Sequence, residues 1–297
     1  MAKQQTLVDW AKGLIQDTEY SSTDILNYMN EAQDRIAGGI MVIYPDGTQV
    51  KSSPLPNLAE SDELTTSTSN AYISMPSDYS RDLHFLVSDT NDIRIEILSS
   101  LGELLTDYPN LDNTSRVSLA AVSGAKLYYQ GMPSTAETLT AYYYRDPYDM
   151  DKYQASTISF TASTSTIGDT GNGLSTFYAG QTIDITSTVS NNAKHTVATV
   201  ASDGSSLTVS GTLVDESAGT TFTIQSRPDG IPTHLHESLL VNYTAMKVFE
   251  RKSISDPRKM EDAKRCKALF NQAMFNLESS IERVPESIEF KSEVRYG

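Results

Sequence analysis

The chain has 297 residues, 38% of them hydrophobic, which is enough for roughly two domains with a sizeable buried core. Its 23 Lys and Arg are outnumbered by 38 Asp and Glu, and the formal net charge of -15 argues against direct nucleic-acid binding, because phosphate contacts need basic side chains. The single cysteine, Cys266, excludes an intramolecular disulfide and is expected to be a buried structural thiol. The sequence contains no secretion signal and no run of roughly 20 apolar residues, so we expect a soluble protein made in the cytoplasm, without a membrane partner.

Residues 4–38 are predicted to form two helices. Ser21 or Ser22 is expected to cap the second helix, with Asp24 in its first turn, and Gly38-Gly39 to end it. The apolar face of the first helix is predicted to contain Leu7, Trp10, Ala11, Leu14 and Ile15. The stripe of the second is predicted to contain Ile25, Met29, Ala32 and Ile36.

Residues 40–154 are predicted to be mainly β. Tyr44-Pro-Asp-Gly47 is typical of a tight turn, because proline presets φ and glycine accepts a positive φ. Short apolar runs follow, separated by Pro, Gly, Asn and Asp, as expected for strands and turns. The predicted strands are 71–75, 83–87, 93–98, 117–122, 126–129 and 138–144, with one short helix over 100–107.

Residues 155–227 differ sharply in composition, being rich in Ser and Thr and free of proline. Strands are predicted at 157–160, 181–185, 196–200, 206–209 and 220–224, and Asp203-Gly204 is expected to join two of them as a tight turn. The regular apolar alternation favours a small antiparallel β-sandwich or barrel over a disordered linker.

Residues 232–283 return to helical periodicity. Ser255-Asp256-Pro257 is expected to separate two helices, and Pro285 to end the second. The first is predicted to bury Leu235, Leu239, Tyr243, Met246 and Phe249. The second is predicted to bury Met260, Ala263, Cys266, Phe270, Ala273, Leu277 and Ile281. Its many basic residues are interpreted as a solvated face.

The last residues switch to strand spacing, with Ile288, Phe290, Val294 and Tyr296 alternating with charged residues. Such a tail is too short to fold alone. It either adds as a strand to a neighbour's sheet or remains a frayed terminus.

The predicted fold class is therefore α+β. Amino- and carboxy-terminal helices would form a bundle beside a central β region, and an all-β module would be inserted between them. The corresponding division is a core of residues 1–154 and 228–283, an inserted module of residues 155–227, and an extended tail of residues 284–297.

The sequence offers no candidate catalytic, cofactor or metal site. His234 and His236 form an H-x-H pair at a helix start, where positions i and i+2 point in different directions. Gly168-Asp-Thr-Gly171 superficially resembles an aspartic-protease motif but occurs once, within the Ser/Thr-rich segment, where a turn is expected. The chain contains neither a G-x-S-x-G elbow nor a phosphate-binding glycine loop. We therefore expect no enzyme activity and no cofactor.

Tyrosine is abundant, with 16 residues, and Tyr142-Tyr143-Tyr144 lie consecutively in one predicted strand. On a strand, consecutive side chains point to opposite faces. We therefore predict that this run presents one face to a core and the other to a partner subunit, because tyrosine is enriched at interfaces.

Several segments together resemble the head-to-tail adaptor (connector) proteins of tailed bacteriophages. The similar segments are Asn27–Ile36, Ile73–Tyr79, Val122–Pro133, Leu139–Pro147 and Pro228–His236. They occur in register and order over about three quarters of the chain, as many weak matches. Residues 155–227 depart from the pattern and resemble the immunoglobulin-like modules of phage structural proteins.

The resemblance implies a structural virion protein at the head-tail interface, present in the host cytoplasm during assembly. It implies a homo-oligomeric ring, dodecameric in similar proteins, beneath the portal protein, through which DNA passes without specific binding. The tail residues Ile288, Phe290, Val294 and Tyr296 would dock on the portal, and the inserted module would face tail proteins such as a nozzle, tube or fibre.

Three alternatives remain open from the sequence. A carbohydrate-binding or adhesion protein would use the β-module and the tyrosines, but would give no reason for helices at both ends. A hydrolase acting through acidic residues has no supporting motif. Another tail-completion protein would share the composition and would differ in its binding partner.

Overall fold

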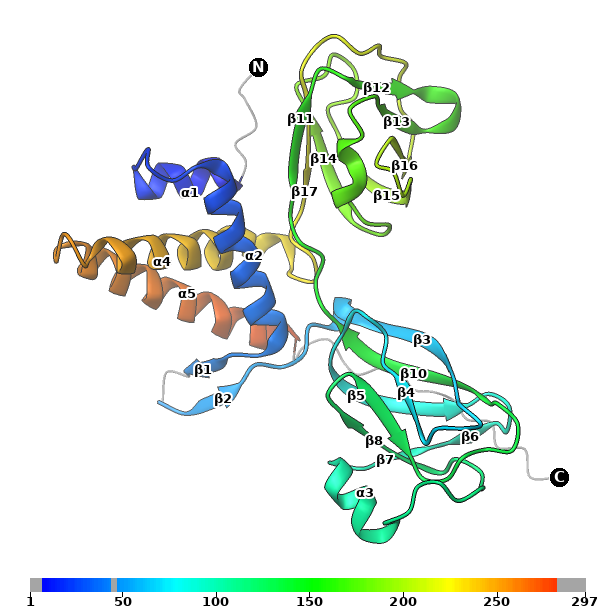
Figure 1. Cartoon of the computed structure of the whole chain (residues 1–297). Coiled ribbons are helices and arrows are strands. Elements are labelled where there is room, and N and C mark those ends of the chain that lie inside the picture. The colour runs from blue at the N-terminus through cyan, green and yellow to red at the C-terminus, as the bar shows by residue number, and fades with distance from the viewer. Residues whose placement is uncertain (1–6, 44–46, 282–297) are drawn as a thin grey trace. The chain divides into compact units, whose positions relative to one another are not determined.

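The structure, a computed structural model, describes residues 7–43 and 47–281 (Figure 1). The described residues form a mixed α+β fold, as predicted, with five α-helices and several sheets that are almost entirely antiparallel. The chain divides into two compact units, one of residues 1–53 with 147–297 and one of residues 54–146. Each boundary falls at a proline, Pro54 or Pro147. The predicted division at residues 155–227 stays a prediction.

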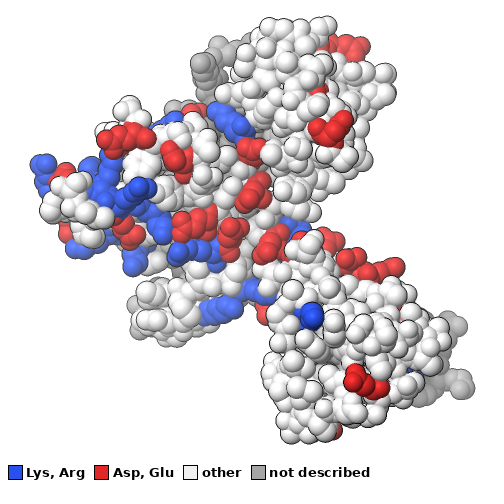
Figure 2. Space-filling view, viewed as in Figure 1, with Lys and Arg blue, Asp and Glu red and all other residues white. Residues whose placement is uncertain are grey.

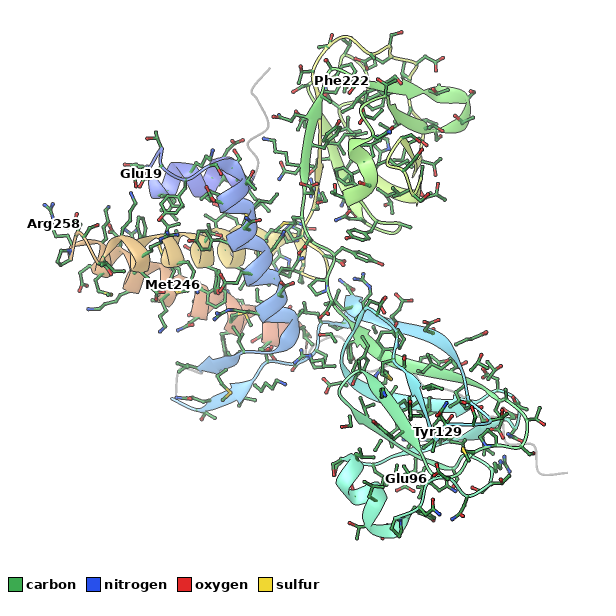
Figure 3. All side chains as sticks on the ribbon, viewed as in Figure 1. Glu19, Glu96, Tyr129, Phe222, Met246 and Arg258 are labelled. Atoms are coloured by element: carbon green, nitrogen blue, oxygen red, sulfur yellow. The ribbon has the colours of Figure 1, made fainter. Side chains whose placement is uncertain are left out.

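Four helices of the first unit pack on one another. They are α1 (Leu7–Ile15), α2 (Ser22–Gly38), α4 (Asn242–Lys252) and α5 (Lys259–Ile281). A 3-10 turn (Thr233–Leu235) and a π-turn (η5, Glu237–Val241) lead into α4. Met246, labelled in Figure 3, belongs to the buried face of α4. The Tyr243 ring of α4 lies 5.4 Å from the Phe270 ring of α5, so aromatic packing joins these two helices.

The predicted boundaries of α2 are confirmed. Ser21 Oγ accepts from the Asp24 amide at 3.1 Å, and Asp24 Oδ2 accepts from the Ser21 amide at 2.9 Å, which completes a capping box. The helix ends at Gly38, and Gly39 adopts a φ of 86°, which favours glycine. All four predicted stripe residues are buried.

The carboxy-terminal helices correct the sequence analysis in two places. The first predicted helix is three consecutive pieces, a 3-10 turn, a π-turn and α4. The second buries its predicted stripe only from Ala263 to Leu277, because Met260 lies in its first turn and is 42% exposed and Ile281, its last described residue, is only half-buried. The predicted stripe from Leu235 to Phe249 is buried as expected.

A short hairpin follows α2, made of β1 (Met41–Ile43) and β2 (Gln49–Lys51). Val42 is buried, and the Ser52 amide donates to the Ile40 carbonyl at 2.7 Å at the hairpin base. Glu278 of α5 accepts from the Ser53 amide at 3.0 Å, which ties the end of the hairpin to α5. A two-stranded sheet is marginal by itself, so these contacts account for its place in the fold.

Two four-stranded sheets and the helix α3 (Leu101–Asp107) form the unit of residues 54–146. One sheet has the order β3 (Ala59–Thr65), β10 (Thr138–Arg145), β5 (Tyr79–Ser88), β6 (Ile93–Arg94). The other has the order β4 (Tyr72–Ser74), β9 (Lys126–Tyr129), β8 (Leu119–Ser123), β7 (Glu96–Ile97). Both contribute to one core, in which Tyr129 (Figure 3) is fully buried. The strands predicted here are confirmed except 93–98, which divides into β6 and β7 in different sheets. The strand β3 was missed because its sequence is acidic and mostly exposed.

The segment 152–226 forms one seven-stranded antiparallel sheet. Its order is β11 (Lys152–Ala155), β17 (Phe222–Ser226), β14 (Thr182–Thr186), β15 (Lys194–Val200), β16 (Ser206–Ser210), β13 (Thr166–Asp169), β12 (Ile158–Thr161). The two end strands, β11 and β12, are joined by only Ser156 and Thr157, so the sheet must curl back on itself. Phe222, labelled in Figure 3, lies in the single core that it encloses. The turn at Asp203-Gly204 is confirmed, whereas the immunoglobulin-like assignment stays a prediction.

Two polar side chains of α2 hold the segments that lead into and out of this sheet. Buried Gln33 donates to the Tyr148 carbonyl at 2.8 Å and accepts from the Asp229 amide at 2.7 Å. Asn30 makes a matching pair of hydrogen bonds with the backbone of Met150. The chain segments at both ends of this sheet are therefore anchored on one helix.

Candidate assembly surfaces

The run Tyr142-Tyr143-Tyr144 divides between two faces of β10, as strand geometry predicts. Tyr143 is 1% exposed and belongs to the core between the two sheets. Its hydroxyl donates to Asp78 at 2.8 Å, and burial together with this carboxylate raises its pKa well above the usual value. Tyr143 is therefore a core residue within the folded subunit, which removes it from the predicted interface.

Tyr142 and Tyr144 lie half-buried on the opposite face of β10. Tyr142 meets the ring of Phe85 edge-on, with centroids 5.8 Å apart, and Tyr144 lies 5.4 Å from the ring of His84. The Arg94 guanidinium lies 4.9 Å from the centre of the Phe85 ring. The structure thus brings two of the three predicted tyrosines into an aromatic outer face, whose contact with a partner subunit stays a prediction.

The predicted portal-docking residues Ile288, Phe290, Val294 and Tyr296 lie outside the described residues. The helix α5 is described up to Ile281. The docking assignment therefore stays a prediction.

The residues considered for chemistry have structural partners. His236 is buried, its Nε2 lies 2.8 Å from the Ile231 carbonyl, and burial lowers its pKa. Cys266 is buried as predicted, which raises the pKa of its thiol. Asp169 accepts hydrogen bonds from Thr157, Tyr153 and the amides of Gly171 and Gly173, so the Asp-Thr-Gly segment is a turn held by its own carboxylate.

Residues 7–43 and 47–281 contain no group of three His, Cys, Asp or Glu arranged to hold a metal ion. Within the same ranges, no helix combines the length and the apolar character that crossing a membrane requires.

Charged side chains gather over the helices, whereas the visible face of the β parts is mostly uncharged (Figure 2). Glu31 of α2 accepts from the Tyr243 hydroxyl at 2.8 Å and pairs with Lys247 and Arg35, each at 3.0 Å. Burial by itself raises the pKa of Glu31, but these hydrogen bonds and positive charges outweigh it and lower the pKa. The cluster therefore joins α2 to α4 through a charged carboxylate.

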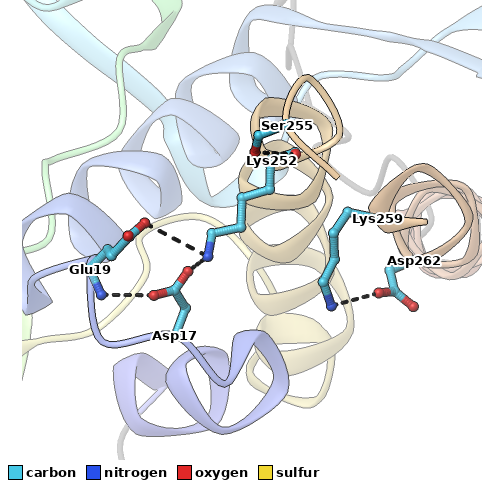
Figure 4. Close-up of polar contacts among 6 residues, drawn as sticks. All are labelled: Asp17, Glu19, Lys252, Ser255, Lys259 and Asp262. Carbon is cyan, nitrogen blue, oxygen red and sulfur yellow. Dashed lines mark hydrogen bonds and ion pairs between the residues drawn. The ribbon is translucent and has the colours of Figure 1, made fainter. Parts of the chain in front are cut away.

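A second set of ionic contacts lies where α1 meets α2 and α4 ends (Figure 4). Lys252 pairs with Asp17 and lies 3.9 Å from Glu19, while Ser255 Oγ donates to the Lys252 carbonyl at 3.1 Å. Lys259 pairs with Asp262 at 3.0 Å in the first turn of α5. Lys252 of α4 thus joins this helix to the segment between α1 and α2, whereas the Lys259 pair lies within α5.

The buried face of α1 differs from the predicted one. Val8, Ala11 and Ile15 are buried, whereas Trp10 is 37% and Leu14 44% exposed. At 3.6 residues per turn, the two exposed residues lie roughly a third of a turn away from the buried three. The apolar stripe of α1 is therefore wider than the surface that the other helices cover.

The exposed side of α1 borders a hollow of about 510 Å³, which we call the α1 groove. Its lining residues are Asp9, Trp10, Gly13, Leu14, Glu237, Val241, Asn242 and Leu269. Leu269, on α5, is 48% exposed. The groove was not predicted, because helical periodicity places Trp10 and Leu14 in the core. The unusual width of the apolar stripe is nevertheless visible in the sequence.

A second exposed apolar surface lies on the hairpin. The strand register pairs Met41 with Lys51 and Ile43 with Gln49 across one face, which we call the hairpin face. All four residues are exposed, Met41 by 55% and Ile43 by 46%. The turn predicted at 44–47 lies largely outside the described residues, and no role was predicted for the strands beside it.

Comparison with protein families gives one informative match. A family model described as SU10 adaptor protein matches residues 4–163, which is 160 of the 297 residues. The match covers α1, α2, the hairpin and the whole unit 54–146, and it ends just after β12. A comparison with curated proteins gives no match.

Proposed function

This chain belongs to the SU10 adaptor protein family, and from that membership we propose that it joins the head of a tailed bacteriophage to its tail. In this proposal, several copies form a ring beneath the portal protein, dodecameric as in similar proteins. The ring continues the DNA channel and offers its far side to tail proteins. It acts by binding and positioning, without catalysis, in the assembled virion.

The observation that carries the proposal is the family match over more than half of the chain. Its residues include both amino-terminal helices and the entire unit 54–146, so it rests on two parts of the fold. Exposed apolar residues on the helical part support assembly into a ring. Trp10, Leu14, Met41, Ile43 and Leu269 are each more than a third exposed in the single chain. Trp10, Leu14 and Leu269 meet at the α1 groove and Met41 and Ile43 share the hairpin face, and exposed apolar side chains that gather in this way mark surfaces that a partner covers.

The charge distribution supports a channel that DNA passes without adhering. Residues 54–146 contain 13 Asp and Glu against 5 Lys and Arg, a net charge of -8 out of -15 for the chain. A wall with this charge repels phosphate, since affinity for DNA comes from basic side chains that displace its counterions. We propose that this unit supplies part of the acidic surface of the ring.

Two further assignments complete the proposal. The carboxy-terminal residues Ile288, Phe290, Val294 and Tyr296 dock on the portal as an added strand, as their strand spacing suggests. Residues 155–227 form an inserted immunoglobulin-like module, which is directed towards tail proteins. The aromatic outer face with Tyr142 and Tyr144 contacts a neighbouring subunit.

The experiment that tests the proposal measures the mass of the protein with and without purified portal protein, for the full chain and for a truncation ending at Arg283. We expect the full chain to join the portal in a closed ring and the truncation to remain free. A ring formed by the truncation would overturn the docking role of the tail alone. If the full chain never joins the portal, the adaptor proposal is wrong.

A further inference from the structure

The α1 groove and the hairpin face both expose apolar side chains, and both belong to the same compact unit. The groove is lined by four elements, because Trp10 and Leu14 come from α1, Val241 from the π-turn, Asn242 from α4 and Leu269 from α5. Its floor is open at Gly13, where an added Cβ would meet no atom within 4 Å. The groove therefore has room for side chains from outside.

The hairpin face has a shape suited to such a groove. It is a narrow two-stranded ribbon whose Met41 and Ile43 project from the side opposite buried Val42. Neither β1 nor β2 pairs with any other described strand, so the ribbon stands apart from the larger sheets. Ile43 and Met41 together offer two apolar side chains one strand period apart.

The charges at the two surfaces are complementary. Asp9 and Glu237 line the groove, whereas Lys51 lies directly across from Met41 on the hairpin face. The groove residues include no Lys or Arg, and the four residues of the hairpin face include no Asp or Glu. Opposite charges around apolar contacts favour one register and one partner over others.

The two surfaces lie at opposite sides of the helical part, with α1 on one side of α4 and α5 and the hairpin on the other (Figure 1). One copy therefore cannot fill its own groove with its own hairpin. A contact between unlike surfaces on opposite sides is head-to-tail, and repetition of it closes a ring when the rotation per copy allows.

We propose that the hairpin face of one copy docks in the α1 groove of the next copy and forms the repeating contact of the ring. Ile43 and Met41 enter the groove between Trp10, Leu14 and Leu269, and Lys51 lies near Asp9 or Glu237. The contact rests on the proposed ring and names its surfaces. It also gives a reason for the exposure of Leu14 and Trp10 on α1.

Cysteine cross-linking on the portal-adaptor complex tests this contact. Buried Cys266 is first replaced by alanine, and the portal thiols are blocked before assembly. We expect a short bis-maleimide to link Ile43→Cys protein to Leu14→Cys protein in one-to-one pairs. The double variant, with both cysteines, should give a ladder of linked copies. Neither single variant should link to itself, because a head-to-tail contact never brings two copies of one surface together.

A matched control uses Ile254→Cys in place of Leu14→Cys. Ile254 is 87% exposed and lies between α4 and α5, outside the groove, so it reacts readily without a nearby partner cysteine. We expect no link from Ile254→Cys to Ile43→Cys. Self-linking of a single variant, or equal linking to Ile254→Cys and Leu14→Cys, would overturn the proposed contact.

Filling the groove gives a second readout that does not depend on thiol chemistry. Gly13→Leu places a side chain in the open floor and should weaken ring formation at least tenfold, whereas Gly13→Ala should change it less than threefold.

A charge reversal tests the polar part of the contact. Lys51→Glu should also weaken the ring, and adding Glu237→Lys should restore most of the loss. A ring that tolerates both Gly13→Leu and Lys51→Glu, with its mass on the portal unchanged, would refute the contact and leave the adaptor function standing. Loss of portal binding by the unmodified chain would instead refute the function.

Discussion

Helices α1 and α2 are neighbours in sequence and both are amphipathic, yet the fold covers their apolar faces to different extents. Every apolar residue of the predicted α2 stripe is buried, and so is polar Gln33. On α1 the other helices cover Val8, Ala11 and Ile15, but Trp10 and Leu14 stay exposed beside a groove. The buried stripe of α2 therefore stabilises the fold, whereas Trp10 and Leu14 of α1 belong to the surface that we propose for assembly.

The largest expected effect comes from truncating the α2 stripe. Met29 is 0% exposed, so Met29→Ala should lower the free energy of unfolding by about 2–5 kcal/mol. Leu14→Ala on α1 is the matched control, and because Leu14 is 44% exposed it should cost less than about 1 kcal/mol. Urea unfolding followed by circular dichroism measures both values. Equal losses for the two variants would contradict the distinction between the helices.

Replacing Gln33 tests the polar part of the α2 face. Gln33→Leu leaves the Tyr148 carbonyl and the Asp229 amide without their partner, so we expect a loss of about 1–3 kcal/mol. Asn27→Leu, at an exposed position of the same helix, is the control and should change stability by less than about 0.5 kcal/mol. Hydrogen exchange should also show faster exchange at residues 148–151 in Gln33→Leu alone. Unchanged exchange there would show that Gln33 does not anchor the connecting segments.

The pH dependence of stability should reveal the Glu31 cluster between α2 and α4. The pKa of Glu31 is lowered from its usual 4.5, so its contribution is complete above about pH 4.5 and is lost as pH falls through the folded-state pKa. Glu31→Gln should therefore reduce stability at pH 7 and flatten the decline below pH 4.5. Thermal melts between pH 3 and pH 7 measure this slope. A variant with the same slope as the unmodified chain would contradict the assignment.

The smallest expected effect is a gain on α1. Gly13 is helical and an added Cβ meets no atom, so Gly13→Ala should raise the free energy of unfolding by up to about 1 kcal/mol. Gly131→Ala is the opposing control, because Gly131 has a φ of 72° and an added Cβ would collide with Ser115. That variant should be destabilised. A loss of stability in Gly13→Ala would mean that the groove floor is closed in solution.

Local rules predicted most of the elements. The helix cap at Ser21, the glycine stop at Gly39 and the turn at Gly204 follow from residue chemistry within a few positions, and all three are confirmed. The alternation along β10 likewise follows from strand geometry, although only burial shows that Tyr143 faces the core. In contrast, the sequence alone did not predict β3, because Glu60, Asp62 and Glu63 hide an edge strand within an acidic run.

The candidate assembly surfaces depend on long-range packing, which explains why sequence periodicity missed them. Trp10 and Leu14 have helical spacing relative to the core residues, and only the extent of α4, α5 and the π-turn decides which side is covered. The hairpin strands are three residues each, too short for a periodic signal. The carboxy-terminal docking residues remain a prediction from sequence.

The most direct test of the account uses the single tryptophan of the chain, Trp10, as a reporter in the α1 groove. The adaptor is labelled with 5-fluorotryptophan, assembled on unlabelled portal, and its ¹⁹F resonance and solvent accessibility are measured before and after ring formation. We predict one shifted resonance and a marked loss of solvent accessibility, because the hairpin of the next copy covers the indole side chain of Trp10. A complete ring in which Trp10 keeps its original resonance and accessibility would contradict the claim that this face of α1 is an assembly surface.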